Sequence, residues 1–283
     1  MTKLLVTGAT GFIGSYVVES LLEKGINVVA TSSDRNKASS KLWFSKVNYK
    51  ELNLKLFDPS VNYFHFFEEP DGIIHLAWEG LPNYNSEFHI EENLPRHFLF
   101  IKNLLDNGIR NITITGTCLE YGMMEGQLSE EMACVPSNPY AIAKYELWRQ
   151  LMSLNLDVNL KWIRLFYMYG KGQNPNSLIS QLEKAIETNA SIFNMSGGEQ
   201  LRDFLPVEKV AEYIVAIALQ NKITGIINCC SGKPIKIKDF VSDYLKSMNK
   251  NIKLNLGYYP YPNYEPMNFW GNESKLKSVL ANL

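Results

Sequence analysis

The chain has 283 residues, of which 46% are hydrophobic and 20% charged, so it is long enough to bury a large core as one or two lobes. Its 28 lysines and arginines balance 29 acidic residues, and the net charge of -1 excludes a global field that would attract nucleic acid or an anionic membrane. The longest apolar runs, such as Ile214 to Leu219, are far shorter than the roughly 20 residues that span a bilayer, and the N-terminus lacks a signal pattern, so we expect a cytoplasmic protein.

The segment from Lys3 to Glu23 predicts a strand, a tight turn and a helix. A short apolar run ends in a G-x-x-G-x-x-G spacing, and a helical apolar pattern follows it. Such a turn brings backbone close to a pyrophosphate, and the free N–H groups of the helix N-terminus face the anion. A glycine-rich turn without a ligand is the alternative, but the position at the first strand favours a dinucleotide site. The expected cofactor contacts are Gly8, Thr10, Gly11, Phe12, Ile13 and Gly14.

The end of the second predicted strand, residues 26–30, decides which cofactor is preferred. A carboxylate there would accept from the ribose hydroxyl of NAD, whereas small hydroxyls and an arginine suit the phosphate of NADP. Ser32, Ser33 and Arg35 follow this strand, so NADP is favoured. Asp34 leaves NAD possible, and a merely solvated loop is the remaining alternative.

The third and fourth predicted strands, residues 49–54 and 71–77, should also end at the cofactor. We therefore expect contacts from Asn53, Leu54, Leu76 and Ala77. The irregular loop 78–83 follows the fourth strand at the edge where ligands bind in parallel sheets. Trp78 and Asn83 are candidates for substrate contact, and a packed loop anchor is the equally favoured alternative.

The next elements bring a second constellation into the cleft. Apolar residues recur at helical spacing over 88–105, residues 112–115 form a fifth strand that leads to Thr117, and a second long helix opens at Tyr140. Tyr140 and Lys144 are four residues apart, so they share one helix face. A cation about 5 Å from a phenol at an effective dielectric of 20 favours the phenolate by roughly 3 kcal/mol. Alone, such a pair is common by chance.

These motifs together resemble the extended short-chain dehydrogenase/reductases, the nucleotide-sugar epimerase and dehydratase family. The resemblance rests on residues 8–14, on Thr117 followed by Tyr121 and Gly122, and on Tyr140 with Lys144, and it covers nearly the whole chain. It implies an α/β fold, with a doubly wound parallel Rossmann sheet and a smaller, interleaved substrate lobe. The expected division is 1–165 with 205–230 for the first, and 166–204 with 231–283 for the second.

The resemblance also implies roles for individual residues. Tyr140 would be the acid/base, Lys144 would orient the cofactor ribose and lower the tyrosine pKa, and Thr117 would bind the reacting sugar oxygen. Thr115, Asn93 and Tyr167 are expected near the cofactor. Arg202 would grip the pyrophosphate of the sugar nucleotide, and Cys118 and Leu119 would line the substrate site.

Departures from the family pattern narrow the expected reaction. Family dehydratases carry Asp-Glu directly after the threonine, where this chain has Cys118 and Leu119, so dehydration is not expected. Tyr167 and Lys209 replace the asparagine and the aspartate of many members, which leaves the pose of the substrate open.

We therefore expect an NADPH-dependent reductase of a dTDP- or CDP-linked 4-keto-6-deoxyhexose that makes a deoxysugar for surface polysaccharide. An NAD-dependent nucleotide-sugar 4-epimerase and a non-catalytic NAD(P)-binding regulator are the alternatives. The family also implies a homodimer, in which the helices beginning near Phe88 and Tyr140 pair with their symmetry mates. The four cysteines lack metal-ligand spacing, so we expect reduced thiols and no metal.

Overall fold

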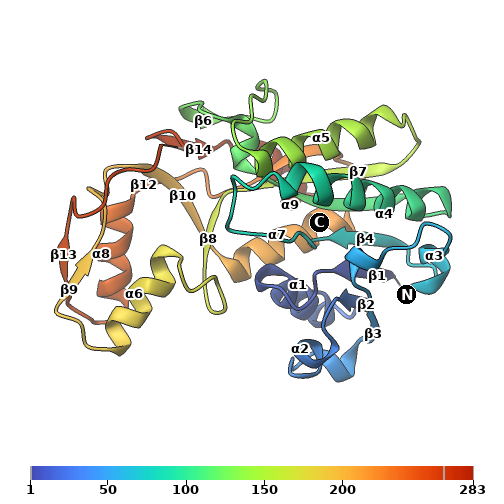
Figure 1. Cartoon of the computed structure of the whole chain (residues 1–283), viewed down its shortest axis with the longest axis horizontal. Coiled ribbons are helices and arrows are strands. Elements are labelled where there is room, and N and C mark those ends of the chain that lie inside the picture. Colours follow the sequence, from blue (N-terminus) through green and yellow to red (C-terminus); the bar gives the residue numbers. More distant parts are fainter. Residues whose placement is uncertain (1, 264, 283) are drawn as a thin grey trace.

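A parallel sheet of seven strands organises the larger part of the molecule (Figure 1). The computed structural model describes residues 2–263 and 265–282. The strand order β11-β7-β5-β4-β1-β2-β3 reverses direction at β1, which lies between β2 and β4. This doubly wound order confirms the predicted Rossmann fold, in which ligands bind where the order reverses. The strands are β1 (Lys3–Thr7), β2 (Asn27–Ser32), β3 (Asn48–Glu51), β4 (Gly72–His75), β5 (Asn111–Thr117), β7 (Asn159–Leu165) and β11 (Gly225–Cys229).

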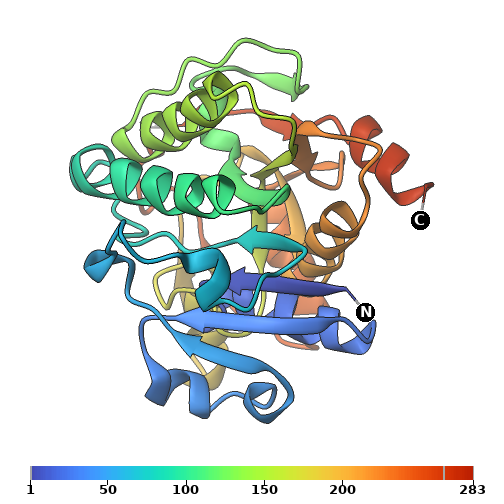
Figure 2. The same cartoon turned by 90° about the vertical axis from the view of Figure 1, so that its right-hand side faces the viewer.

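Helices cover both faces of this sheet (Figure 2). On one face α1 (Phe12–Glu23), α7 (Val207–Leu219) and α9 (Ser274–Leu280) bury a cluster that includes Val17 and Ile214. On the other, α3 (Tyr63–Phe66), α4 (Leu94–Asp106) and α5 (Pro139–Ser153) bury a cluster that includes Phe100 and Leu147. Because both faces are covered, the inner strands β1, β4 and β5 are almost entirely buried, as expected for a parallel sheet, whereas the edge strand β3 is not.

Smaller elements form a lobe beside the carboxyl ends of the strands (Figure 1). The strands β8 (Tyr167–Tyr169), β10 (Leu201–Pro206) and β12 (Pro234–Lys236) form one sheet, while β9 (Ile192–Asn194) pairs with β13 (Lys253–Asn255) and β6 (Gly126–Leu128) pairs with β14 (Phe269–Gly271). The helices α6 (Leu178–Glu187) and α8 (Ile237–Ser247) enclose a separate cluster around Leu182 and Val241. We propose the same division of the chain that the sequence predicts, because this lobe has its own core.

Several predicted elements differ in their bounds, and two of these differences have a local cause. The predicted helix 88–105 is divided into a π-helical segment, η3 (His89–Asn93), and α4, because Pro95 in the first turn of α4 has no N–H to continue an α-helical ladder. The third strand ends at Glu51, because Asn53 begins the 3₁₀ helix η2 (Leu54–Leu56) and accepts from the Lys55 amide at 3.0 Å. Further short helices are α2 (Arg35–Ser39), η1 (Phe44–Lys46) and η4 (Cys118–Tyr121).

All four cysteines are free thiols, and Cys118, Cys229 and Cys230 are buried. Between residues 2 and 282, leaving out 264, no helix is long and apolar enough to cross a membrane. Within the same residues no group of three or more metal-ligating side chains comes together. Leu99 on α4 is 46% exposed, and the pairing of this helix with a symmetry mate stays a prediction.

Candidate active site

The turn between β1 and α1 is shaped by glycine. Gly8 has φ +67°, and a Cβ at this position would lie 2.8 Å from the Ala77 amide nitrogen. A Cβ on Gly14 would collide with the Gly8 carbonyl, so only glycine lets α1 pack this closely on the turn. Gly11 is the N-cap of α1 and offers no side-chain cap. The first amides of α1 therefore stay available to an anion.

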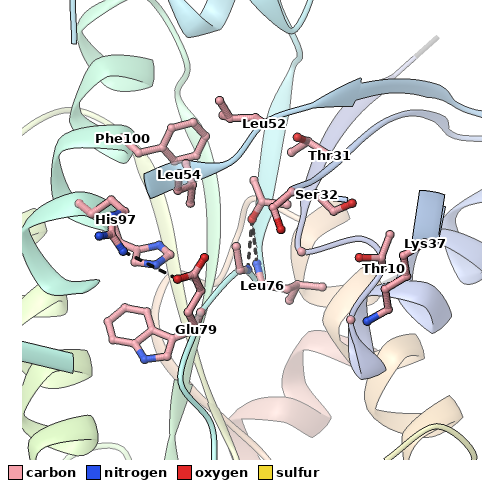
Figure 3. A pocket seen from close by; sticks show the side chains of 17 residues that line it. Thr10, Thr31, Ser32, Lys37, Leu52, Leu54, Leu76, Glu79, His97 and Phe100 are labelled. Carbon is pink, nitrogen blue, oxygen red and sulfur yellow. Dashed lines mark hydrogen bonds and ion pairs between the residues drawn. The ribbon is translucent and has the colours of Figure 1, made fainter. Parts of the chain in front are cut away.

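A cavity of about 200 Å³ lies beside this turn, where the strand order reverses. Figure 3 shows Thr10 and Lys37 on one side of it and His97, Phe100 and Leu54 on the other. The buried Thr31 hydroxyl has no hydrogen-bond partner, so a ligand with a polar group fits this wall. One end offers hydrogen-bond donors for phosphate, and the other combines the flat or apolar side chains of Leu54, Trp78 and Phe100 with Glu79 and Arg96, an arrangement that suits a dinucleotide. The lining residues are Thr7, Gly8, Thr10, Gly11, Thr31, Ser32, Ser33, Lys37, Leu52, Leu54, Leu76, Ala77, Trp78, Glu79, Arg96, His97 and Phe100.

At the polar end of the cavity, the cation that the sequence predicts, Arg35, is absent from the lining. Ser32 and Ser33 line the cavity, but Arg35 does not. The Arg35 guanidinium lies 5.9 Å from the Phe44 ring and 5.7 Å from the Tyr49 ring, where cation–π attraction holds it. Arg35 is therefore placed away from the cavity in this arrangement.

Lys37 lines the cavity in place of Arg35. Its backbone amide donates to the Asp34 carboxylate at 2.9 Å, so Asp34 is the N-cap of α2. This cap uses the carboxylate that would otherwise argue for NAD. The first turn of α2 thus places a lysine at the cavity while its acid is occupied.

The catalytic candidates converge at the ends of β5 and α5. Tyr140 and Lys144 are 8% and 2% exposed. The Lys144 ammonium donates to the Thr115 carbonyl at 2.9 Å and lies 3.9 Å from the centre of the Trp78 ring. The Tyr140 hydroxyl shares a hydrogen bond with Thr117. Trp78 lines the cavity, so it joins the predicted cofactor site to the predicted acid/base.

Burial dominates the electrostatics of this pair. It raises the pKa of Tyr140, and the hydrogen bond with Thr117 opposes this only in part. Burial also lowers the pKa of Lys144 to about 7, against the attraction of Glu120. Lys144 is not among the main groups that shift the pKa of Tyr140 in this arrangement, because its ammonium faces Thr115 and Trp78. Its effect on the tyrosine stays a prediction.

Glu120 is a buried acid that the sequence reasoning missed. Its Oε1 accepts from the Thr117 amide at 2.8 Å, and its Oε2 accepts from Arg164 Nε at 2.8 Å. Trp162 donates to the same carboxylate. The bond from the Thr117 amide is one half of a capping box, whose other half is the Thr117 side chain accepting from the backbone of Glu120, and this box fixes the backbone of Thr117 at the end of β5. Thr117 is therefore held by groups that all lie in the core.

The predicted pyrophosphate ligand Arg202 lies in a closed cluster. Its side chain is 1% exposed and is 3.0 Å from the Glu265 carboxylate, which also accepts from the Tyr167 hydroxyl. Both terminal nitrogens of the guanidinium also donate to backbone, to the carbonyls of Leu201, Pro266 and Met267. Only Arg202 Nε lacks a partner. Arg202 and Tyr167 thus do not reach the cavity, because residues from the tail already satisfy them.

Several other predicted contacts have structural partners instead. Asn93 is fully buried and donates to the Glu79 carbonyl at 3.0 Å. Asn83 is exposed, and its carbonyl interacts with His89 Nε2 at 2.9 Å. Cys118 packs in the core, and the Leu119 amide donates to the Thr117 hydroxyl oxygen at 3.3 Å. Phe12 and Ile13 begin α1 behind the turn, and Asn53 caps η2. These residues shape the site without lining the cavity.

The cavity also includes residues that the sequence reasoning did not select. Thr7 and Thr31 lie at the ends of β1 and β2, where the strand-end rule could have found them. His97 and Phe100 follow Asn93 at helical spacing, which is a signal for a shared face. The others carried no signal of their own: Lys37, Leu52, Glu79 and Arg96.

Solved structures share this fold along the whole chain. A UDP-glucose-4-epimerase from Stenotrophomonas maltophila with bound NAD has a TM-score of 0.85 at 15% identity, covering 99% of this chain and 93% of that one. A UDP-glucuronic acid 4-epimerase from Bacillus cereus, in complex with UDP-glucuronic acid and NAD, has a TM-score of 0.81 at 23% identity, with the same coverage. At these identities the likeness shows the fold alone.

Sequence relatives show the family. A dTDP-6-deoxy-L-talose 4-dehydrogenase (NAD(+)) from Aggregatibacter actinomycetemcomitans is 32% identical over 95% of this chain and 99% of its own length. A dTDP-4-dehydro-6-deoxyglucose reductase from Escherichia coli is 25% identical over 84% of this chain and 78% of its own. The profile described as "NAD dependent epimerase/dehydratase family" matches residues 4–230. The chain therefore belongs to the NAD-dependent epimerase/dehydratase family, and it is an NAD(P)-dependent enzyme.

Proposed function

We propose that the enzyme reduces the 4-keto group of a dTDP- or CDP-linked 6-deoxyhexose, in the synthesis of a deoxysugar for surface polysaccharide. The observation that carries this proposal is the buried Thr117–Tyr140 pair next to Lys144, without an acidic pair after Thr117. Relatives support the substrate class, since their names include a dTDP-6-deoxy-L-talose 4-dehydrogenase, a dTDP-4-dehydro-6-deoxyglucose reductase and a CDP-abequose synthase.

Tyr140 is the proposed proton donor. Burial raises the pKa of this phenol, so it carries its proton at neutral pH and is suited to act as a general acid. A reduced nicotinamide held in this cavity would supply the hydride for the ketone carbon. Tyr140 then donates its proton to the oxygen of the developing alkoxide, while the Thr117 hydroxyl, oriented by the Leu119 amide, stabilises the negative charge.

The residues after Thr117 do not supply a second acid/base pair. Burial raises the pKa of the Cys118 thiol, so it stays protonated and cannot remove a proton from the sugar. Leu119 has no titratable group. Water elimination needs such a pair, and the site therefore favours simple reduction over dehydration.

We also propose that NADP(H) is preferred over NAD(H). Ser33 and Lys37 line the polar end of the cavity, and Asp34 is occupied as a helix cap. A lysine and hydroxyls would attract the ribose phosphate of NADP, and no free carboxylate at the end of β2 would repel it. One relative has NAD(+) in its name, so direct titration of both cofactors is the test of this preference.

A stoichiometric experiment tests the proposed function against the alternatives. The protein is mixed with NADPH or NADH and with dTDP- or CDP-4-keto-6-deoxyhexoses, and the absorbance of the reduced cofactor is followed beside a Tyr140→Phe control. Consumption of one reduced cofactor per product supports the reductase. Interconversion of nucleotide sugars without net cofactor change would establish an epimerase. Saturable cofactor binding without any turnover would establish a regulator.

A further inference from the structure

Three buried side chains form a hydrogen-bonded chain beneath the cavity. The Thr7 hydroxyl lies 2.8 Å from His75 Nδ1, and His75 Nε2 lies 2.8 Å from His97 Nδ1. His75 is fully buried and His97 is 1% exposed. Thr7 and His97 both line the cavity, whereas His75 does not. The proposed reduction uses none of these groups.

The backbone of β4 and the residues after it determine the direction of the first hydrogen bond. The Thr7 hydroxyl oxygen accepts from the amides of Leu76, at 3.2 Å, and Ala77, at 3.3 Å. A hydroxyl has two acceptor lone pairs and one proton. Since both lone pairs are occupied, the hydroxyl proton must be donated to His75 Nδ1.

Both histidines are neutral, so the direction of the first hydrogen bond also determines the direction of the second, between His75 and His97. Burial, with a contribution from Lys144, lowers the pKa of His75 to about 3. Burial first, and then repulsion between an imidazolium at this position and its neighbours His75, Lys144 and Arg96, lowers the pKa of His97 well below its usual value. A neutral imidazole has one N–H. With Nδ1 accepting, His75 carries its proton on Nε2 and donates to His97 Nδ1, which leaves the proton of His97 on Nε2.

This last N–H faces away from His75, at the wall of the cavity. In the described part of the chain no residue accepts a hydrogen bond from His97 Nε2. The Trp78 ring stacks on the imidazole with 4.6 Å between centroids, and Leu54 and Phe100 lie beside it in the cavity (Figure 3). Because this donor borders the cavity, a bound ligand can accept its hydrogen bond.

We propose that Thr7 and His75 fix the tautomer of His97, and that His97 Nε2–H donates a hydrogen bond to the base of the bound nucleotide cofactor. This rests on the proposed function in one respect, that the cavity holds the dinucleotide. The chemistry of this end selects the acceptor. The donor lies beside the flat or apolar side chains of Trp78 and Phe100, and the Glu79 carboxylate lines the same end. Such a wall suits a ring nitrogen of a flat heterocycle and repels a phosphate, whereas phosphate oxygens suit the open amides of α1 and Lys37 at the other end.

Heteronuclear NMR tests the tautomers without any ligand or substrate. The chain has only four histidines, so single His→Gln variants assign their ring signals in ¹⁵N-labelled protein. The expected result is an Nε2–H tautomer for both His75 and His97. Thr7→Val should remove the preference of His75, whereas Thr113→Val, a buried threonine on β5 away from the cavity, should leave it intact. An Nδ1–H tautomer of His97 in the wild type would overturn the proposal.

Calorimetric titration with ADP, NADP⁺ and nicotinamide mononucleotide tests the ligand. His97→Met removes the donor and His97→Gln keeps an N–H. The Met variant should lose roughly fivefold to tenfold in affinity for ADP and NADP⁺, the Gln variant should stay within about twofold, and neither should change mononucleotide binding. Equal losses in both variants, or none, would contradict the proposal. A wild type that binds no adenine nucleotide would overturn this inference and the cofactor site together, whereas binding without reduction would remove only the reductase.

Discussion

The proposed cofactor side and the proposed substrate side of this molecule differ in whether their anion-binding groups already have partners. On the cofactor side, α1 has no side-chain cap and the buried Thr31 hydroxyl has no partner. On the substrate side, Arg202 is bound by three backbone carbonyls and by Glu265. The first side leaves hydrogen-bond donors without partners, so a ligand can bind them. On the second side, almost every donor of the Arg202 guanidinium already has a partner within the protein.

This difference shows what each kind of site needs from the chain. The donors of the cofactor turn are backbone amides, which local glycine geometry leaves open without any distant contact. The Arg202 guanidinium needs partners for a buried charge, and the tail supplies them. We infer that the cofactor site is formed in the free protein, while a diphosphate would meet Arg202 only after the segment around Glu265 moves.

The largest expected effect concerns Tyr140, where the two sides meet. Tyr140→Phe keeps the ring packed but removes the proton donor, so single-turnover rates should fall by about 10² to 10⁴, while NADP(H) affinity stays nearly unchanged. Rates measured across pH in Tyr140→Phe and Thr117→Val decide between donors. A water held by Thr117 predicts that the valine variant is the worse of the two, and a Tyr140→Phe enzyme within a few-fold of the wild type would exclude the proposed acid.

The second prediction concerns the closed cluster. Arg202→Met removes the cation beside the Glu265 carboxylate, which is 9% exposed, and leaves it only the Tyr167 hydroxyl among its side-chain partners, so the free energy of unfolding should fall by about 3 kcal/mol. Urea denaturation measures this loss. The double variant Arg202→Met/Glu265→Gln should recover part of it, because no unpaired charge remains. If Arg202→Met unfolds like the wild type and only weakens nucleotide-sugar binding, the cluster is not structural and Arg202 is an open ligand contact.

The third prediction concerns Lys144, whose burial lowers the free energy of unfolding when the side chain is charged. Its pKa is about 7 in the folded protein and about 10.4 when unfolded. Between these values the unfolded chain binds more protons, so stability rises with pH in this window. Lys144→Met should therefore be more stable than the wild type below pH 7, by an amount on the order of a few kcal/mol, and the difference should vanish above about pH 10.4. A difference that does not change between pH 6 and 11 would contradict the lowered pKa.

The sequence predicted the fold and the phosphate turn because both depend on local patterns. The apolar strand runs and the spacing of Gly8, Gly11 and Gly14 determine them directly. What it could not predict depends on contacts between distant segments. Glu265 meets Arg202 from a tail without periodicity, and Glu120 reaches Thr117 and Arg164 through the core. Burial of Lys144 likewise changed its charge, which the spacing of four residues alone did not reveal.

The smallest expected effect concerns the cation at the polar end of the cofactor cavity. Arg35 and Lys37 are both exposed residues of α2, but only Lys37 lines the cavity, while Arg35 lies against Phe44 and Tyr49. Lys37→Met should weaken NADP(H) binding by roughly tenfold, the value of one charge-assisted hydrogen bond, and should leave NAD(H) binding unchanged. Arg35→Met is the matched control and should change the NADP(H) affinity by less than about threefold. Fluorescence titration of both reduced cofactors into both variants measures the ratio. If the arginine variant loses the preference and the lysine variant keeps it, the guanidinium must leave its aromatic partners to bind the phosphate, and the cofactor side would be less preformed than its open amides indicate.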